Sequence, residues 1–246
     1  MLSYEPPLPR NMLTDSHHQR SITQTVLQWL VRWTFRIQLT ICYRIRVHGL
    51  ENFPESGSTL ICSNHQSFLD PVVLGVTSPR PLNYLARKTL FTIGPMRMFL
   101  ELNDAIPIDL DSLGMTGLKE SLKRLKRGEM LVLFPEGTRS DDGELLPLKP
   151  GFELLARRSK SLILPVALDG CYQAFPRDAK LPRMGEIQVV IGEPIQYDEY
   201  KNWSAEETAE ILQVRIAKCL SDARRRISGS QTSRDVNPIA QTEPLD

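Results

Sequence analysis

The sequence predicts a single α/β domain with a mixed, largely parallel sheet flanked by helices and preceded by an N-terminal amphipathic helical segment. Two observations support this prediction. Short apolar runs alternate with segments of helical period along the chain, and strands separated by helices favour parallel pairing. The chain has 246 residues, of which 41% are hydrophobic, enough for one domain with a buried core but not for two large ones.

The predicted elements follow one another from residue 44 onward. The predicted strands are residues 44–48, 59–63, 83–86, 105–108, 130–134, 162–168 and 187–191. The predicted helices are residues 71–77, 112–127, 151–159 and 205–226. The domain is expected to span residues 45–227. Residues 1–20 are expected to be flexible and residues 228–246 to be a disordered tail, because both ends are rich in polar residues and proline.

Residues 21–44 predict a helix with a wide apolar face and a narrow polar stripe. The stripe consists of polar residues spaced four apart: Gln24, Gln28, Arg32, Arg36, Thr40 and Arg44. One interpretation is an interfacial helix whose tryptophans lie at headgroup depth and whose arginines extend toward anionic lipid. The alternative is a helix packed on the domain's own core, with its arginines in solvent. A membrane-spanning helix is not expected, because no run of roughly 18 apolar residues occurs.

Composition excludes several classes of function. The formal net charge is +1, whereas a dedicated nucleic-acid-binding protein normally carries a basic excess. The four cysteines, Cys42, Cys62, Cys171 and Cys219, are far apart and form no CxxC motif. They therefore indicate neither a zinc site nor a disulfide framework, and no metal is expected.

The first candidate site lies in residues 64–70, directly after a predicted strand. Asn64 and His65 open this segment, and Asp70 closes it. Histidine is a natural base near neutral pH, and a carboxylate on its far ring nitrogen fixes the tautomer and stabilises the imidazolium. The amide of Asn64 is suited to brace the turn. The alternative is structural, because an aspartate before Pro71 commonly caps a helix.

The second candidate site, FPEGTRS at residues 134–140, again follows a predicted strand. Gly137 permits a close backbone approach, Thr138 offers a hydroxyl, and Arg139 carries a planar fork suited to phosphate or carboxylate. Glu136 is an acceptor for Arg139 or for a substrate hydroxyl. The alternative is a surface turn with an exposed arginine.

Together the two blocks resemble the glycerolipid acyltransferase family typified by the 1-acylglycerol-3-phosphate acyltransferases. The pattern NHxxxxD followed by FPEGTRS, each block at a strand end, is highly specific. The resemblance spans residues 47–195. It includes residues 104–109 and 164–168, which look like the family's second and fourth blocks. The family also places membrane-binding helices before its domain, where this chain has residues 21–44.

The resemblance implies roles for the matching residues. His65 is the implied general base for the acceptor hydroxyl, and Asp70 orients it. The hydroxyl then attacks the acyl thioester directly, with no acyl-enzyme intermediate and no metal. The implied acceptor-binding residues are Asn64, Glu136, Gly137, Thr138 and Arg139. Pro165 and its neighbours are implied to shape the acyl-donor side.

Three more cations are candidates for contacts to a phosphate, either on the acceptor or on coenzyme A. Arg87 and Lys88 follow a predicted strand, and a solvated strand end is the alternative interpretation for both. Lys149 precedes a predicted helix and adds positive charge to the same region.

One position departs from the family pattern. The family's second block ends in an arginine that contacts the acceptor phosphate, but Leu110 stands at the corresponding position. Leucine donates no hydrogen bond, and losing such a contact typically costs ~1.5–3 kcal/mol. Three explanations remain open: another cation such as Arg139, Lys149 or Arg87 replaces the arginine, the acceptor lacks a phosphomonoester, or the site is degraded.

The sequence therefore predicts an O-acyltransferase that transfers a fatty acyl group from acyl-CoA or acyl-ACP to a lysophosphatidic-acid-like acceptor in phospholipid biosynthesis. The alternatives are the same chemistry on another lysolipid or hydroxyl acceptor, a thioester hydrolase, and a non-catalytic membrane lipid-binding protein. No bound cofactor is expected, and the expected partners are a membrane lipid surface, the acyl donor and a lysophospholipid, but no nucleic acid. The expected location is the cytoplasmic face of a bacterial membrane, because the first twenty residues lack the apolar stretch of a signal peptide.

Overall fold

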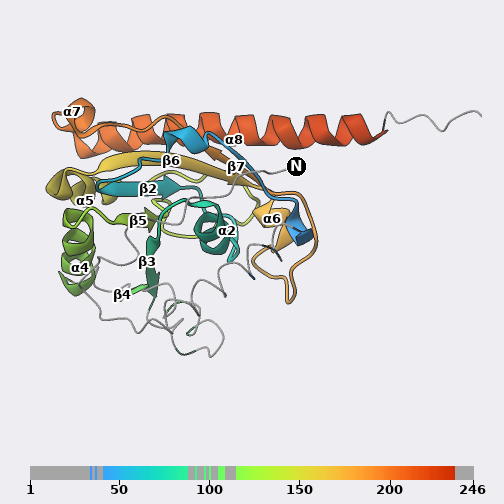
Figure 1. Ribbon diagram of the computed structural model, residues 1–246, viewed down its shortest axis with the longest axis horizontal. Coiled ribbons are helices and arrows are strands. Elements are labelled where there is room, and N and C mark those ends of the chain that lie inside the picture. Colours follow the sequence, from blue (N-terminus) through green and yellow to red (C-terminus); the bar gives the residue numbers. More distant parts are fainter. Residues whose placement is uncertain are drawn as a thin grey trace, which may run out of the picture.

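The computed structural model describes residues 34, 37, 41–87, 92, 97, 100, 105–108 and 115–235. They form a seven-stranded sheet with the strand order β1-β7-β6-β2-β5-β3-β4 (Figure 1). The strands are β1 Arg46–His48, β2 Thr59–Ser63, β3 Leu82–Arg87, β4 Ile106–Ile108, β5 Met130–Leu133, β6 Leu162–Asp169 and β7 Gln188–Ile191. Each neighbouring pair is parallel except β6 and β7, which run antiparallel. The predicted mixed, largely parallel sheet is confirmed, and each predicted strand end lies within two residues of the observed one.

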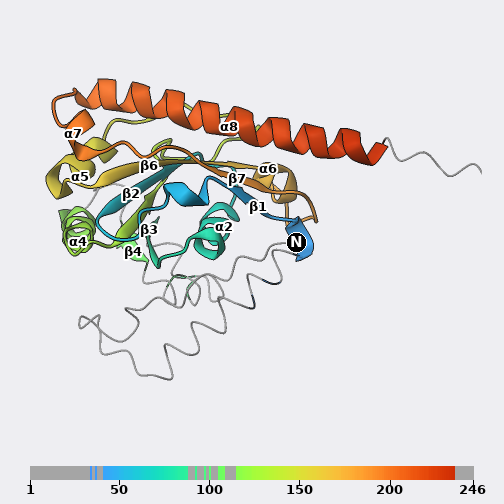
Figure 2. The ribbon, with the colours of Figure 1, turned by 45° about the horizontal axis from the view of Figure 1, so that its top comes forward.

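Helices cover both faces of this sheet (Figure 2). They are η1 Leu50–Asn52, α2 Asp70–Thr77, α4 Met115–Lys126, α5 Phe152–Ser159, α6 Cys171–Ala174, α7 Tyr197–Tyr200 and α8 Ala205–Asp235. The sequence predicted α2, α4, α5 and α8. The short elements η1, α6 and α7 were not predicted, because one helical turn is too short to show a hydrophobic period.

The last helix, α8, is longer than predicted. The helix α8 was expected to end at Arg226, with a disordered tail from residue 228, but it continues to Asp235. Propagating a formed helix adds one hydrogen bond for each residue fixed, so weak helix formers can extend it. Residues 236–246 lie outside the described residues.

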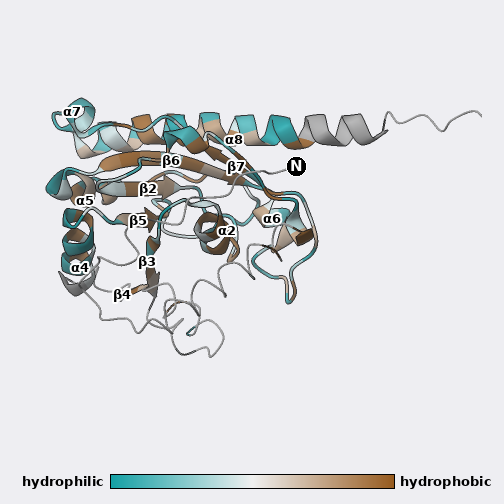
Figure 3. Ribbon diagram, in the orientation of Figure 1, coloured by the Kyte–Doolittle hydropathy of each residue, from teal (hydrophilic) through white to brown (hydrophobic). Residues whose placement is uncertain are grey.

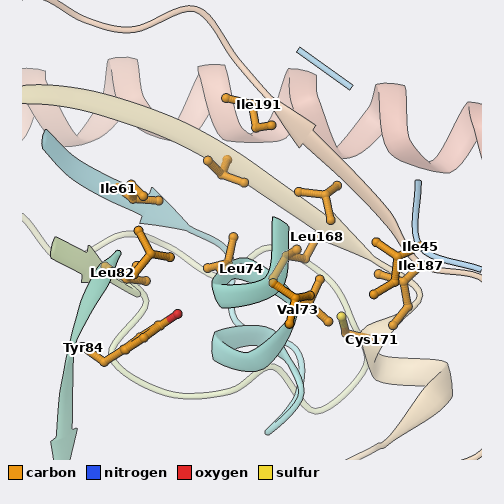
Figure 4. Close-up of a cluster of buried hydrophobic side chains, with 14 of the residues drawn as sticks. Ile45, Ile61, Val73, Leu74, Leu82, Tyr84, Leu168, Cys171, Ile187 and Ile191 are labelled. Atoms are coloured by element: carbon orange, nitrogen blue, oxygen red, sulfur yellow. The ribbon is translucent and has the colours of Figure 1, made fainter. Parts of the chain in front are cut away.

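The central strand β2 shows how the two layers of helices are held. Its Ile61 packs in one cluster with Val73 and Leu74 of α2 (Figure 4). Its Leu60 and Cys62 belong to the cluster on the opposite face, which includes residues of α5 and α8. All five residues of β2 are therefore buried. Such continuous apolar runs are typical of parallel strands covered on both faces, and they appear as hydrophobic ribbons in the middle of Figure 3.

Most of the predicted amphipathic segment, residues 21–44, lies outside the described residues, as do residues 1–20. The membrane-binding helix therefore stays a prediction. At its described positions, Ile37 and Ile41 are exposed, whereas Tyr43 is buried in the core. Within the described part of the chain, none of the helices combines the length and apolar character needed to cross a membrane.

Candidate active site

The two candidate blocks meet at the carboxyl edge of the sheet. The strands β2 and β5 are parallel neighbours, so the loops that follow them leave from the same edge. The backbone N–H of Ser140 donates to the carbonyl oxygen of His65 at 2.8 Å. The rings of His65 and Phe134 are stacked, with centroids 4.0 Å apart. The sheet thus brings together residues that are far apart in sequence.

His65 and Asp70 form the predicted pair. Oδ2 of Asp70 lies 2.7 Å from Nδ1 of His65. The same carboxylate oxygen accepts the backbone N–H groups of Gln66 and Ser67, at 2.6 and 2.7 Å. Asp70 is fully buried, whereas the imidazole is partly exposed. With its Nδ1–H directed at the carboxylate, His65 presents the lone pair of Nε2 as a base.

The helix-cap alternative for Asp70 is wrong. The helix α2 starts at Asp70 itself, and its N-cap position is Leu69, which makes no side-chain cap bond. The N–H groups that Asp70 accepts belong to residues before the helix, so the carboxylate closes a tight turn around His65.

Asn64 braces the turn, as predicted, and its implied part in acceptor binding stays a prediction. It is fully buried. Its amide nitrogen donates to the carbonyl oxygen of Leu168 at 2.9 Å, and its amide oxygen accepts the N–H of Leu168 at 2.8 Å. Both polar atoms of the amide are therefore bonded to the end of β6.

Glu136 is bonded to the backbone of two other segments, and its implied role in acceptor binding stays a prediction. Its two carboxylate oxygens accept backbone N–H groups, Oε1 from His65 at 2.7 Å and Oε2 from Leu146 at 3.2 Å. The side chain is buried. Burial raises the pKa of Glu136 from its ordinary value near 4.5 to about 7, although both N–H donors act in the opposite direction. Glu136 therefore joins three segments of the site.

Gly137 and Lys149 lie side by side at the surface. Gly137 has φ +74°, a conformation that glycine adopts without strain. A Cβ at this position would lie 2.9 Å from Nζ of Lys149, so a side chain there would displace the ammonium group. The backbone N–H of Lys149 donates to the carbonyl oxygen of Pro135 at 2.9 Å. The structure thus places Lys149 against the FPEGTRS block.

Arg139 and Thr138 complete this block. The guanidinium carbon of Arg139 lies 3.7 Å from the centre of the Phe68 ring, in a cation–π contact with the catalytic turn. Thr138 is exposed, and its hydroxyl makes only a long contact of 3.5 Å with the carbonyl oxygen of Arg139. Arg139 and Lys149 therefore place two positive charges on the segment beside His65.

The other predicted cations are less fully placed. Arg87 ends β3, and β3 pairs in parallel with β5, so its backbone lies toward the carboxyl edge of the sheet. Its side chain is not described, and Lys88 and Leu110 lie outside the described residues. Among the described residues, no group of three His, Cys, Asp or Glu side chains is arranged to hold a metal ion.

Several supporting residues were not predicted. Gln66 Nε2 donates to the carbonyl oxygen of Gly143 at 2.7 Å. The hydroxyl of Ser67 donates to the carbonyl oxygen of Phe175, also at 2.7 Å. The thiol of Cys171 is buried close to Asp70. Burial, followed by the negative charge of Asp70, raises its pKa well above the ordinary value, so the thiol stays protonated. The sequence signal was the strand-end position of Gln66 and Ser67 inside the first block, but their partners lie in distant loops.

A histidine–carboxylate pair at the carboxyl edge of a largely parallel sheet, beside the cations Arg139 and Lys149, is the arrangement of an α/β enzyme that activates a hydroxyl. Residues 44–169, more than half of the chain, match a family model described as Acyltransferase. The chain belongs to this acyltransferase family, and it is an O-acyltransferase of lipid metabolism.

Particular relatives sharpen this assignment. A 1-acyl-sn-glycerol-3-phosphate acyltransferase of Bacillus subtilis is 30% identical over 70% of this chain and 84% of its own length. A lyso-ornithine lipid O-acyltransferase of Rhizobium meliloti is 27% identical over 88% of this chain and 83% of its own length. The crystal structure of a 1-acyl-sn-glycerophosphate acyltransferase from Thermotoga maritima has the same fold. The two structures superpose with a TM-score of 0.68 and are 22% identical in sequence. The superposition covers 85% of this chain and 81% of the Thermotoga maritima chain.

Proposed function

We propose that the protein transfers a fatty acyl group from acyl-CoA or acyl-ACP to the free hydroxyl of a lysophosphatidic-acid-like acceptor, giving phosphatidic acid. The observation that carries this proposal is the oriented pair of His65 and Asp70 beside the positive charges of Arg139 and Lys149. Relatives named as 1-acyl-sn-glycerol-3-phosphate acyltransferases support the choice of acceptor.

In the proposed reaction, Nε2 of His65 removes the proton from the acceptor hydroxyl while its oxygen attacks the thioester carbonyl carbon. The tetrahedral intermediate expels the thiolate, and the imidazolium returns the proton to the leaving sulfur. Asp70 stabilises the imidazolium between these two steps, because its carboxylate accepts Nδ1–H. The products are the acylated acceptor and the free thiol of the donor.

The remaining site residues divide between holding the turn and binding the acceptor. The polar atoms of Asn64 and Glu136 form hydrogen bonds with backbone groups, so the proposed role of both residues is to hold His65 in place. Arg139 and Lys149 are proposed to contact the acceptor phosphate, and Thr138 offers a hydroxyl beside them. No cofactor is proposed beyond the acyl co-substrate.

A second candidate acceptor is a lysolipid without a phosphomonoester. Two observations favour it. Leu110 stands where the family pattern has a phosphate-binding arginine. The relative that covers 88% of this chain is named as an acyltransferase for lyso-ornithine lipid. The chemistry at His65 is the same for both acceptors, so only the cationic residues distinguish them.

The proposed location is the cytoplasmic face of a bacterial membrane, with residues 21–44 lying in the interface. This proposal is supported by the basic, apolar character of that segment. It also agrees with the chemistry, because a lysolipid acceptor is itself a membrane component.

The test uses the full chain with anionic vesicles and labelled palmitoyl-CoA or palmitoyl-ACP. Lysophosphatidic acid, glycerol 3-phosphate and lyso-ornithine lipid are offered separately, and product formation is measured by thin-layer chromatography. We expect acylation of lysophosphatidic acid above the other two. Acylation of lyso-ornithine lipid alone selects the second candidate.

The same assay separates the remaining alternatives. Release of free palmitate with no acylated lipid, unaffected by Arg139→Ala, would indicate a thioester hydrolase. Absence of both products, with the lysolipid still bound, would indicate a non-catalytic lipid-binding protein.

A further inference from the structure

The loop between α6 and β7, residues 176–186, exposes two large apolar side chains. Leu181 is 77% exposed and Met184 is 80% exposed, the highest values among the large apolar side chains that the structure describes. Single exposed apolar residues are common on protein surfaces. Two of them three residues apart, in a loop that extends from the sheet (Figure 1), need a physical explanation.

The base of this loop is fixed by backbone hydrogen bonds. The N–H of Arg183 donates to the carbonyl oxygen of Ala174 at 2.7 Å. On the other side, the N–H of Gly185 donates to the carbonyl oxygen of Cys42 at 3.4 Å. Ile41, the residue that precedes Cys42, is 73% exposed. Apolar side chains from two distant segments therefore lie at one end of the molecule, where Figures 1 and 2 both place residues 41–43 beside the loop.

Positive charge accompanies these apolar residues. Lys180 and Arg183 are exposed neighbours of Leu181 and Met184. Neither forms an ion pair with any acidic side chain in the described part of the chain. By contrast, the nearby Arg177 is paired with Asp141 at 3.0 Å. Exposed apolar side chains beside cations that form no ion pair among the described residues match the interface of an anionic bilayer, where apolar groups enter the acyl boundary and cations meet the headgroups.

The loop is also joined to the catalytic turn. Its preceding residue, Phe175, accepts the hydroxyl of Ser67 at its carbonyl oxygen, at 2.7 Å. The rings of Phe68 and Phe175 lie 6.4 Å apart. A surface that docks through this loop therefore lies next to the residues that hold His65.

We propose that residues 180–184, together with Ile41, form a docking surface for an anionic lipid bilayer. Ile41 belongs to the predicted helix of residues 21–44, and residues 180–184 add a second segment to that interface. Docking through both segments places the turn of residues 64–70 near the interface where a lysolipid resides. The use of this surface to reach a lysolipid rests on the proposed function, but the binding of the surface to a bilayer does not.

The test compares the full chain with its Leu181→Ser/Met184→Ser variant in sedimentation with phosphatidylglycerol–phosphatidylcholine vesicles. Removing two large apolar side chains from an interface weakens partitioning by about 10- to 100-fold. The matched control is Val214→Ser, because Val214 is 69% exposed on α8, away from the loop. We expect the control to bind as the wild type does. Equal binding by the double variant overturns the proposal.

The charge component is tested with Lys180→Gln/Arg183→Gln. Each cation near an anionic surface contributes about fivefold to partitioning at low salt. The loss is expected to shrink as salt is added, because exposed charges are screened. A loss that is independent of salt and of phosphatidylglycerol content contradicts the role assigned to these cations.

A label provides a direct readout of insertion. Met184→Cys, in a Cys42→Ser background, carries an environment-sensitive dye, and the other three cysteines are buried. Vesicles should blue-shift the dye, and nitroxide lipids should quench it. A dye that stays in water while the protein is bound overturns the proposal. So does a change in oligomeric mass in place of vesicle binding, because the occupant is then another copy of the chain.

Acylation of a short-chain, water-soluble lysolipid separates this inference from the proposed function. We expect the Leu181→Ser/Met184→Ser variant to acylate it as fast as the wild type. If neither protein acylates any acceptor, the proposed function fails, and the vesicle measurements still decide the docking surface.

Discussion

The catalytic turn, residues 64–70, and the cationic segment, residues 137–149, lie next to each other but are built differently. In the turn, polar side chains form hydrogen bonds with the backbone, as Asn64 does with Leu168. In the cationic segment, Gly137, Thr138 and Lys149 are exposed. The turn is fixed from inside the domain, whereas these three residues of the segment are open to solvent.

The two regions are therefore suited to different tasks. A base must be held in one orientation to act on a reacting hydroxyl, and that requires a rigid, buried frame. Recognition of a headgroup needs charges that can reach a ligand. Substitutions in the turn should therefore lower kcat, and substitutions in the cationic segment should mainly raise KM.

The largest effect is expected from His65→Ala and Asp70→Asn. The first removes the base, and the second removes the acceptor of Nδ1–H, so each should lower kcat by roughly 10³- to 10⁴-fold. Acyl-transfer kinetics with circular dichroism as a folding control measure this. Folded His65→Ala with near-normal kcat would falsify the assignment of the base.

A second effect concerns stability and tests how tightly Glu136 holds the turn. Its folded pKa of about 7 lies above its ordinary value near 4.5, so the folded state binds the extra proton between these values. The stability contributed by this proton is present below about pH 4.5, decreases as pH rises and is lost above about pH 7, a change of about 3 kcal/mol at most. Glu136→Gln removes this component.

Chemical denaturation at pH 5 and pH 8 measures the difference. Wild type should lose more stability than Glu136→Gln on going to pH 8, and the exposed control Glu210→Gln should behave as wild type. Identical pH dependence in wild type and Glu136→Gln would contradict the raised pKa.

A substitution in the cationic segment should mainly change the KM for the acceptor. Arg139→Ala removes a charge-assisted contact and is expected to raise KM for a phosphate-bearing acceptor about 10- to 100-fold, with a small change in kcat. Lysolipids with and without a phosphomonoester provide the comparison. An equal loss for both kinds of acceptor would show that Arg139 supports the turn through Phe68 instead.

The smallest effect should come from α8. Arg224 donates to the Glu144 carboxylate at 2.9 Å and to the carbonyl oxygen of Gly143 at 3.0 Å, the same oxygen that accepts Gln66. Arg224→Gln should lower kcat by about two- to tenfold, because it loosens a support without removing a reacting group. The neighbouring Arg225→Gln is the control, and a similar loss in both variants would mean that the effect is not specific to the turn.

The sequence predicted the strands well because buried parallel strands are apolar runs with clear ends. The residues 59–63 and 130–133 follow this rule, and each is followed by a polar block that marks the carboxyl edge. The pairing of His65 with Asp70 was also predicted, since the two are local in sequence and the turn between them is short.

The bracing role of Asn64 was predicted, but its partner and the contacts of Glu136 were not, for a physical reason. Both carry polar groups suited to a substrate, and sequence shows the group but not what lies opposite it. Their partners are Leu168 and Leu146, whose backbone atoms arrive only through the sheet and its loops. The contribution of Arg224 was hidden in the same way, because α8 reads as an ordinary amphipathic helix.

The bond between Asn64 and Leu168 joins residues 104 positions apart, and this spacing governs when the enzyme matures. During synthesis, His65 and Asp70 emerge long before β6 exists to receive the amide of Asn64. Pairings between distant parallel strands close slowly, since the chain between them must first be ordered. While residues 162–169 are still to be synthesised, this bond cannot hold the turn around His65.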